Sequence, residues 1–135
     1  MNMQRVLQLM AEKGASDLYL SANAPALLKI NGQLMPITDH VLAPSMPRTL
    51  LAEVLTAEQL EELDQTGELN IGIGIPKVGS FRLSGFKQRN SIAAVVRCVP
   101  VKIPSIDTLN LPPILAPLSL EKRGLILMVE IGRAH

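Results

Sequence analysis

The sequence predicts an α+β domain in which an antiparallel sheet packs against flanking helices. Two patterns predict it: apolar residues recur at helical spacing within 3–10 and 50–63, and apolar and polar residues alternate within 17–37 and 69–99. Turn signals, without helical segments, separate the strands within 69–99 from one another. Strands joined by such short turns pair antiparallel.

The composition is that of a globular protein. Of the 135 residues, 47% are hydrophobic and 19% are charged, and the formal net charge is +1. So small a positive excess excludes a protein dedicated to binding nucleic acid. The single cysteine, Cys98, cannot form an internal disulfide, so we expect a cytoplasmic protein. No segment has the length of a membrane span, and the first residues lack a signal-peptide pattern.

The chain begins with a helix and a hairpin. Residues 2–13 place apolar side chains at positions i, i+3, i+4 and i+7, the spacing of one helical face. A short strand is expected over residues 17–21. The segments 26–30 and 33–37 flank the dipeptide Asn31-Gly32, which favours the type I′ turn of a two-residue β-hairpin.

Two helices are predicted after a loop. Pro47 favours the first turn of a helix whose apolar residues extend to Leu55. For the next helix, Thr56 is the expected N-cap, Gln59 is its capping-box partner and Gly67 is the terminating residue.

Three successive strands follow these helices, joined by turn signals after each of the first two. Five prolines between residues 100 and 117 then predict an extended linker. One further apolar strand is expected beyond that linker. The four strands are expected at residues 69–75, 80–89, 92–99 and 125–129.

Several residues are candidates for chemistry by type but not by spacing. The Gly72-Ile-Gly74 pair lacks the GxxxxGK[ST] pattern of a phosphate loop, and it indicates a β-bulge or a close backbone approach instead. His40, His135 and Cys98 offer neither metal-ligand spacing nor a nucleophile–base pair. No metal site and no catalytic residue is predicted in this chain.

The arginines Arg82, Arg89 and Arg97 lie on two consecutive strands that a turn at Asn90 would pair. That pairing would bring their guanidinium groups into one basic patch. Guanidinium groups bind phosphate oxygens through paired hydrogen bonds and stabilise charge in phosphoryl transfer. From these residues alone, an anion-binding patch and ordinary solvated strand arginines both stay open.

Five blocks of sequence resemble, in order, the type IV pilus retraction ATPases, with the PilU branch nearest and the PilT branch next. The resemblance covers residues 3–129, and five ordered blocks are far more specific than any one of them. The blocks are Gly14-Ala-Ser-Asp-Leu18, Lys29-Ile-Asn-Gly32, Phe81-Arg-Leu-Ser-Gly-Phe-Lys-Gln-Arg-Asn90, Leu111-Pro-Pro-Ile-Leu115 and Arg123-Gly-Leu-Ile-Leu127.

This resemblance implies a domain organisation. Residues 1–99 would form a PAS-like N-terminal domain, residues 100–123 a proline-rich linker, and residues 124–135 the first strand of a truncated RecA-like ATPase domain plus a tail. Where the family has its Walker A loop, this chain has Glu130-Ile-Gly-Arg-Ala-His135. We therefore expect the chain to be inactive alone and to hold no cofactor, with ATP and Mg²⁺ bound by the full-length parent.

The resemblance also implies a function, that of a regulatory and interface domain in a hexameric motor for twitching motility. The domain would pack on the RecA-like domain of its own or a neighbouring subunit and direct Arg82, Arg97 and Arg89 toward the bound nucleotide. The motor would be cytoplasmic and peripheral at the inner membrane, on the pilus platform machinery. Two alternatives stay open: a stand-alone PAS-like sensor of a small ligand, and the equivalent domain of a pilus-extension or type II secretion ATPase.

Overall fold

The computed structural model describes residues 2–100 and 103–129. The chain divides into two units, residues 1–101 and residues 102–135. The first unit contains both helices and strands, which confirms the α+β class. Its elements are α1 (Met3–Glu12), β1 (Asp17–Leu20), β2 (Leu27–Ile30), β3 (Gln33–Pro36), α2 (Met46–Leu51), α3 (Ala57–Thr66), β4 (Glu68–Ile75), β5 (Gly79–Gln88) and β6 (Ser91–Val99).

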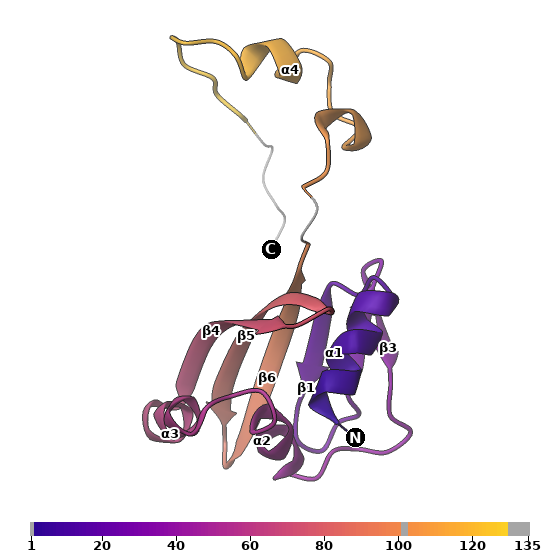
Figure 1. The fold of residues 1–135 in the computed structure, drawn as a ribbon, viewed down its shortest axis with the longest axis vertical. Coiled ribbons are helices and arrows are strands. Elements are labelled where there is room, and N and C mark those ends of the chain that lie inside the picture. The colour runs from indigo at the N-terminus through magenta and orange to yellow at the C-terminus, as the bar shows by residue number, and fades with distance from the viewer. Residues whose placement is uncertain (1, 101–102, 130–135) are drawn as a thin grey trace. The chain divides into compact units, whose positions relative to one another are not determined.

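The strands of the first unit form one six-stranded antiparallel sheet in the order β3-β2-β1-β6-β5-β4 (Figure 1). The chain builds this sheet from two meanders, β1–β3 and β4–β6, which join where β1 pairs with β6. That pairing sets Asp17 opposite Arg97, 80 residues further along the chain. The centre of the sheet is therefore made of segments from opposite ends of the unit.

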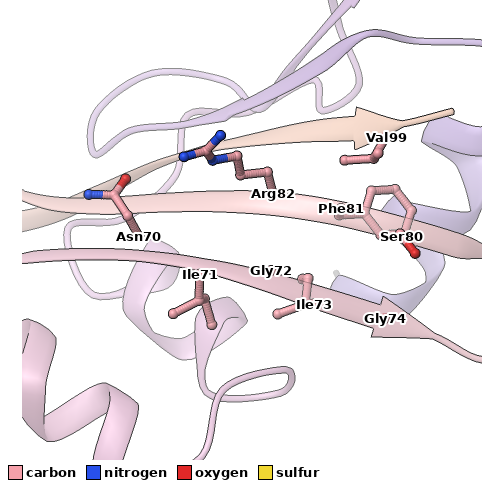
Figure 2. Close-up of a pocket in the computed structure, with 9 residues that line it drawn as sticks. All are labelled: Asn70, Ile71, Gly72, Ile73, Gly74, Ser80, Phe81, Arg82 and Val99. Carbon is pink, nitrogen blue, oxygen red and sulfur yellow. The ribbon is translucent and has the colours of Figure 1, made fainter.

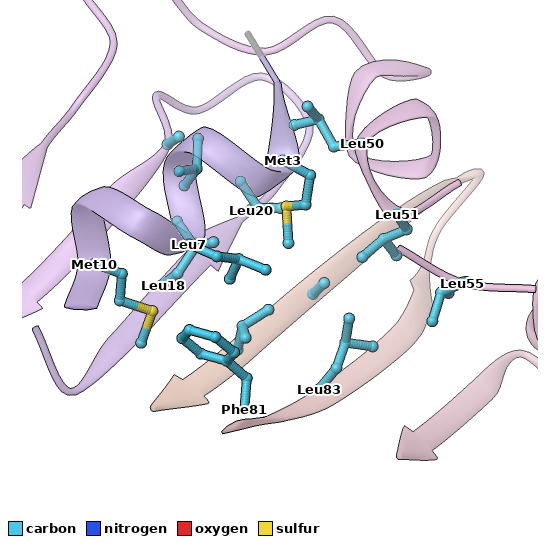
Figure 3. Close-up of a cluster of buried hydrophobic side chains, with 14 of the residues drawn as sticks. Met3, Leu7, Met10, Leu18, Leu20, Leu50, Leu51, Leu55, Phe81 and Leu83 are labelled. Atoms are coloured by element: carbon cyan, nitrogen blue, oxygen red, sulfur yellow. The ribbon is translucent and has the colours of Figure 1, made fainter. Parts of the chain in front are cut away.

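One face of the sheet is the core face. Its side chains include Leu18, Leu28, Phe81 and Val96, which are at most 1% exposed. Helices α1, α2 and α3 all bury residues in this one core cluster. Figure 3 shows those from α1 and α2. The helices of residues 2–100 therefore lie on the core face, and the opposite face is called the open face below. The helix residues in the core are Met3, Val6, Leu7, Met10, Leu50, Leu51 and Leu63.

The local signals for α3 are confirmed. The Thr56 side chain accepts a hydrogen bond from the Gln59 backbone N–H at 3.3 Å, and the Gln59 side chain accepts one from the Thr56 N–H at 3.0 Å. Gly67 ends the helix with a φ of 79°, the left-handed conformation that suits glycine. Helix α1 also has an N-cap, because the Asn2 side chain accepts a hydrogen bond from the Arg5 backbone N–H.

Helix α2 ends earlier than the sequence predicts. It has Pro47 in its first turn, as expected, but it stops at Leu51 rather than near Leu55. The backbone N–H groups of Glu53 and Val54 bond three residues back, to the Leu50 and Leu51 carbonyls, which is a tighter turn than an α-helix. This turn leaves the following residue, the N-cap of α3, in an extended conformation.

The hairpin turns follow the predicted chemistry with one shift of boundary. Asn31 and Gly32 have φ of 49° and 81°, as a type I′ turn requires, and they join β2 to β3. Strand β5 ends at Gln88 rather than Arg89, because Arg89 adopts a φ of 56° in the turn to β6. A residue in that conformation cannot continue a strand.

The second unit contains little regular structure among its described residues. A 3₁₀ turn, η1 (Ile106–Thr108), and a short helix, α4 (Leu115–Leu118), interrupt the predicted linker. The predicted strand at residues 125–129 is wrong: the segment pairs with no described strand, and Met128 is 90% exposed. A strand forms only where a neighbour supplies ladder hydrogen bonds, and none does so here. The predicted tail, residues 130–135, lies outside the described residues.

No helix in the described part of the chain combines the length and the apolar character needed to cross a bilayer.

Candidate functional site

The open face carries a row of charged side chains across four strands. The strand register sets Lys29 of β2 opposite Asp17 of β1, Asp17 opposite Arg97 of β6, and Arg97 opposite Arg82 of β5. Directly opposed residues point to the same face of a sheet. The row, called the basic row below, ends on β4 at Gly72, which has no side chain.

Arg82 and Arg97 are cross-strand neighbours of like charge within the basic row, so the predicted pairing of their strands is confirmed. Like charges directly opposite one another destabilise a pair of strands. Within the described residues, Arg97 has a counter-ion, whereas Arg82 makes no ion pair. Both residues are exposed. An anion between the two guanidinium groups would relieve this repulsion and receive several charge-assisted hydrogen bonds.

Asp17 is the counter-ion of Arg97, and it is buried, with 4% of the residue exposed. Its Oδ1 accepts a hydrogen bond from Arg97 Nε at 2.9 Å, and its Oδ2 accepts one from Ser16 Oγ at 2.8 Å. Burial by itself raises the pKa of Asp17, but the two hydrogen bonds and the charges of Arg97 and Lys29 outweigh burial and lower it. The same hydrogen bond and charge raise the pKa of Arg97, so both groups are charged at neutral pH.

A hollow of about 540 Å³ lies over β4 and β5 beside Arg82 (Figure 2). Asn70, Ser80, Gly72 and Gly74 also line it. A Cβ added at either glycine would meet nothing within 4 Å, so the sheet itself does not require glycine there. The ladder between β4 and β5 is uninterrupted, which makes the β-bulge expectation wrong. The close-approach alternative fits the open space above these two residues.

Arg89 does not join the patch that the sequence predicts. It lies in the turn between β5 and β6, seven positions beyond Arg82 along the hairpin. At roughly 3.3 Å per residue, this spacing separates the two Cα atoms by about 23 Å. A single phosphate group cannot contact both side chains, so the predicted three-arginine patch is corrected to a pair.

The other candidate residues do not converge. His40 is exposed after β3, and Cys98 is half-buried and packs against the core from β6. His135 lies outside the described residues. In residues 2–100 and 103–129, no three His, Cys, Asp or Glu side chains gather as metal ligands would.

Sequence reasoning missed Asp17 and Lys29 as parts of the site. Both lie in strands whose alternation is visible, but their connection to Arg97 depends on which strands become neighbours. The available signal is weak: an acidic residue begins an otherwise apolar strand, Asp17-Leu-Tyr-Leu20. A buried carboxylate requires a partner, so this position could have been marked as one half of an ion pair.

No family model matches the chain, but individual relatives do. The chain is 39% identical over 129 residues to the type IV pilus ATPase PilU of Pseudomonas aeruginosa, a match that takes in 96% of this chain. It corresponds to the N-terminal domain of type IV pilus retraction ATPases. PilT, a pilus retraction ATPase of the same organism, is 27% identical over 128 residues.

A solved structure supports this correspondence with the pilus retraction ATPases. The crystal structure of the pilus retraction motor PilT with bound ADP matches with a TM-score of 0.74 and 29% identity, over 87% of this chain and 35% of that one. The chain spans about a third of the length of the curated relatives it matches, 34% of PilU and 37% of PilT. The predicted resemblance and the α+β fold class are thus confirmed.

Proposed function

We propose that residues 1–99 are the regulatory and interface domain of a hexameric pilus-retraction motor for twitching motility. The single observation that carries the proposal is the pair Arg82 and Arg97, opposed on an open sheet face and short of one counter-ion. Residues 100–123 would act as the linker, and residues from 124 onward would begin the RecA-like ATPase domain of the parent. ATP and Mg²⁺ would bind that ATPase domain.

The open face is suited to packing against another protein domain. Beside the basic row it exposes apolar side chains, among them Leu34, Phe86 and Val99, at 57%, 38% and 44%. A mixed surface of this kind, with apolar residues around arginines, is typical of protein interfaces. The partner would be the ATPase domain of the same or a neighbouring subunit, in a cytoplasmic motor at the pilus machinery of the inner membrane.

The two arginines would stabilise negative charge in the transition state and would not themselves form or break covalent bonds. In phosphoryl transfer, negative charge shifts over the phosphate oxygens, and a positioned guanidinium stabilises that charge in the transition state. Arg82 would supply a full planar fork, because none of its donors is engaged in an ion pair within the described residues. Arg97 would supply its terminal amines, since its Nε already donates to Asp17.

The test is steady-state ATP turnover of the assembled full-length motor. Arg82→Ala is expected to lower turnover by on the order of a thousandfold if Arg82 acts as an arginine finger, while melting of the domain changes little, because a surface change typically costs under about 0.5 kcal/mol. Arg82→Lys should rescue poorly, because lysine keeps the charge and loses the fork. Arg89→Ala, at the far turn, is the matched control and should keep turnover. Equal turnover in all variants would refute the proposal.

The sensor alternative finds less support in this fold. A sensor of this kind would hold its ligand against the core face of the sheet, and that face is filled by side chains such as Phe81, Met3 and Leu7 (Figure 3). A hollow of about 950 Å³ does lie outside the core, between α1 and the segments 37–40 and 75–78. Its lining is a mixture of amides, charged groups and aliphatic side chains that specifies no ligand class.

A further inference from the structure

The side chain of Arg97 is largely exposed, while its Nε is hydrogen-bonded to Asp17. Its side chain is 70% exposed, while the side chain of its partner Asp17 is 5% exposed. The single hydrogen bond between them uses Nε, at 2.9 Å, and no hydrogen bond within the described residues engages the terminal amines. An arginine used only for stability would gain more by pairing both of its donor edges.

The chain contains such a pair for comparison. Arg48 of α2 donates to Asp64 of α3 through both Nε and Nη2, which is the closed, two-point arrangement of a structural ion pair. The Arg97 pair differs because its carboxylate is almost fully buried and accepts only from Nε of the guanidinium. Within the described residues, the two terminal amines of Arg97 donate no hydrogen bond to Asp17 or to any other group.

The Asp17 carboxylate is itself held rigidly. Ser16 Oγ donates to its second oxygen at 2.8 Å. The Ser16 backbone is in turn fixed between two strands, because its N–H donates to the Lys29 carbonyl at 2.9 Å and its carbonyl accepts from the Cys98 N–H at 3.0 Å. These contacts tie the carboxylate to β2 and β6, and through Nε they restrict the direction of the Arg97 side chain.

We propose that Asp17 is the positioning residue for Arg97, holding the guanidinium by Nε so that its terminal amines face a phosphate group presented to the open face. This inference rests on the proposed function and adds to it a residue that does not itself touch the ligand. Asp17 also separates Arg97 from Lys29 in the basic row and offsets the repulsion between Arg97 and Arg82. Without Asp17, the exposed Arg97 side chain would sample several rotamers. Ligand binding would then have to offset the entropy that is lost when a single rotamer is selected.

The first test uses the chain itself and reads the arginine side chain by NMR. In the wild type, the Nε–H proton of Arg97 is expected to exchange slowly with water, and inorganic pyrophosphate should shift the signals of Arg97 and Arg82. Asp17→Asn is expected to speed this exchange and to broaden the Arg97 signals. The milder Ser16→Ala, at an exposed residue, should give an intermediate result. Unchanged exchange in Asp17→Asn would overturn the proposal.

The second test uses turnover of the full-length motor in a double-mutant cycle. Asp17→Asn should lower turnover per folded hexamer to within about threefold of Arg97→Ala, and it should cause no further loss in the Arg97→Ala background. Asp64→Asn, which breaks the ion pair with Arg48, is the matched control and should leave turnover unchanged. If Asp17→Asn lowers only the melting temperature, or its effect adds fully to that of Arg97→Ala, the positioning role is refuted.

The two proposals fail in different ways. If Arg82→Ala and Arg97→Ala both keep full turnover, the proposed function is wrong. If those variants lose turnover while Asp17→Asn keeps it, the function stands and the positioning role alone is refuted.

Discussion

Asp17 is buried, and its pKa is nevertheless lowered. Burial favours the protonated carboxyl, whereas the hydrogen bonds from Arg97 and Ser16 favour the carboxylate, and the lowered pKa shows which effect is larger. Removing Arg97 reverses the balance, because burial stays and the main stabilising partner is lost. Arg97 therefore contributes to stability through Asp17, unlike a solvated strand arginine.

We predict that Arg97→Ala raises the pKa of Asp17 and destabilises the domain. An NMR titration of the Asp17 carboxyl carbon in wild type and variant measures the pKa, and thermal melting measures the stability. Arg82→Ala is the control, because it removes the neighbouring charge and leaves the Asp17 hydrogen bonds in place. The same Asp17 pKa in all three proteins would contradict the account.

The lowered pKa also fixes a pH dependence. A carboxyl whose pKa is lower in the folded than in the unfolded state stabilises the fold above its unfolded value, near 3.9, and this contribution is lost as pH falls through the folded pKa. We predict that the difference in unfolding free energy between wild type and Asp17→Asn shrinks as pH falls below about 4. Urea unfolding at pH 7 and pH 3 measures it. A difference that is the same at both pH values would count against this linkage.

At the scale of single elements, features that depend on adjacent residues were predicted correctly. Features that depend on contacts between distant segments were not. The capping box of α3 and the Asn31-Gly32 turn depend on a few adjacent residues, so the sequence was sufficient for both. The end of α2 and the position of Arg89 depend on how the chain turns between neighbouring elements. The Asp17–Arg97 contact depends on the pairing of β1 with β6, which no pattern within either strand reveals.

The α3 cap provides a prediction at this scale. Thr56→Ala removes the acceptor for the Gln59 N–H and is expected to lower the unfolding free energy by about 1 kcal/mol. The control is Gln65→Ala, an exposed position of the same helix, where a change within about 0.5 kcal/mol is expected. Denaturant melts of both variants give the comparison, and equal effects would mean that the cap does not stabilise α3.

Gly85 and Gly72, on neighbouring strands, are expected to respond in opposite ways to substitution by valine. A Cβ at Gly85 on the core face would lie 3.3 Å from Leu63 Cδ2, so Gly85→Val is expected to destabilise by about 1–3 kcal/mol through overpacking. Gly72 on the open face has nothing within 4 Å, so Gly72→Val should be neutral or stabilising, because β-branched residues favour strands. The reverse order of stability would show that the two faces of the sheet are wrongly assigned.

At the scale of the whole molecule, the sheet is covered on one face and open on the other. The core face is filled by its helices, and the open face presents the basic row together with exposed apolar side chains. The apolar segment at residues 125–129, without a strand partner in the described chain, is a second surface that a larger protein would cover. Both features accord with a chain that spans about a third of its relatives.

We propose that the open face directs Arg82 and Arg97 toward a nucleotide held by an ATPase domain. The most direct measurement is a cryo-electron microscopy structure of the full-length hexamer with a non-hydrolysable ATP analogue. We expect terminal amines of both arginines to lie within about 3.5 Å of γ-phosphate oxygens in at least one subunit interface, with Arg97 still bonded to Asp17 through Nε. A structure in which the open face meets solvent, or in which both guanidinium groups stay more than about 10 Å from every phosphate, beyond a Debye length at ordinary salt, would contradict it.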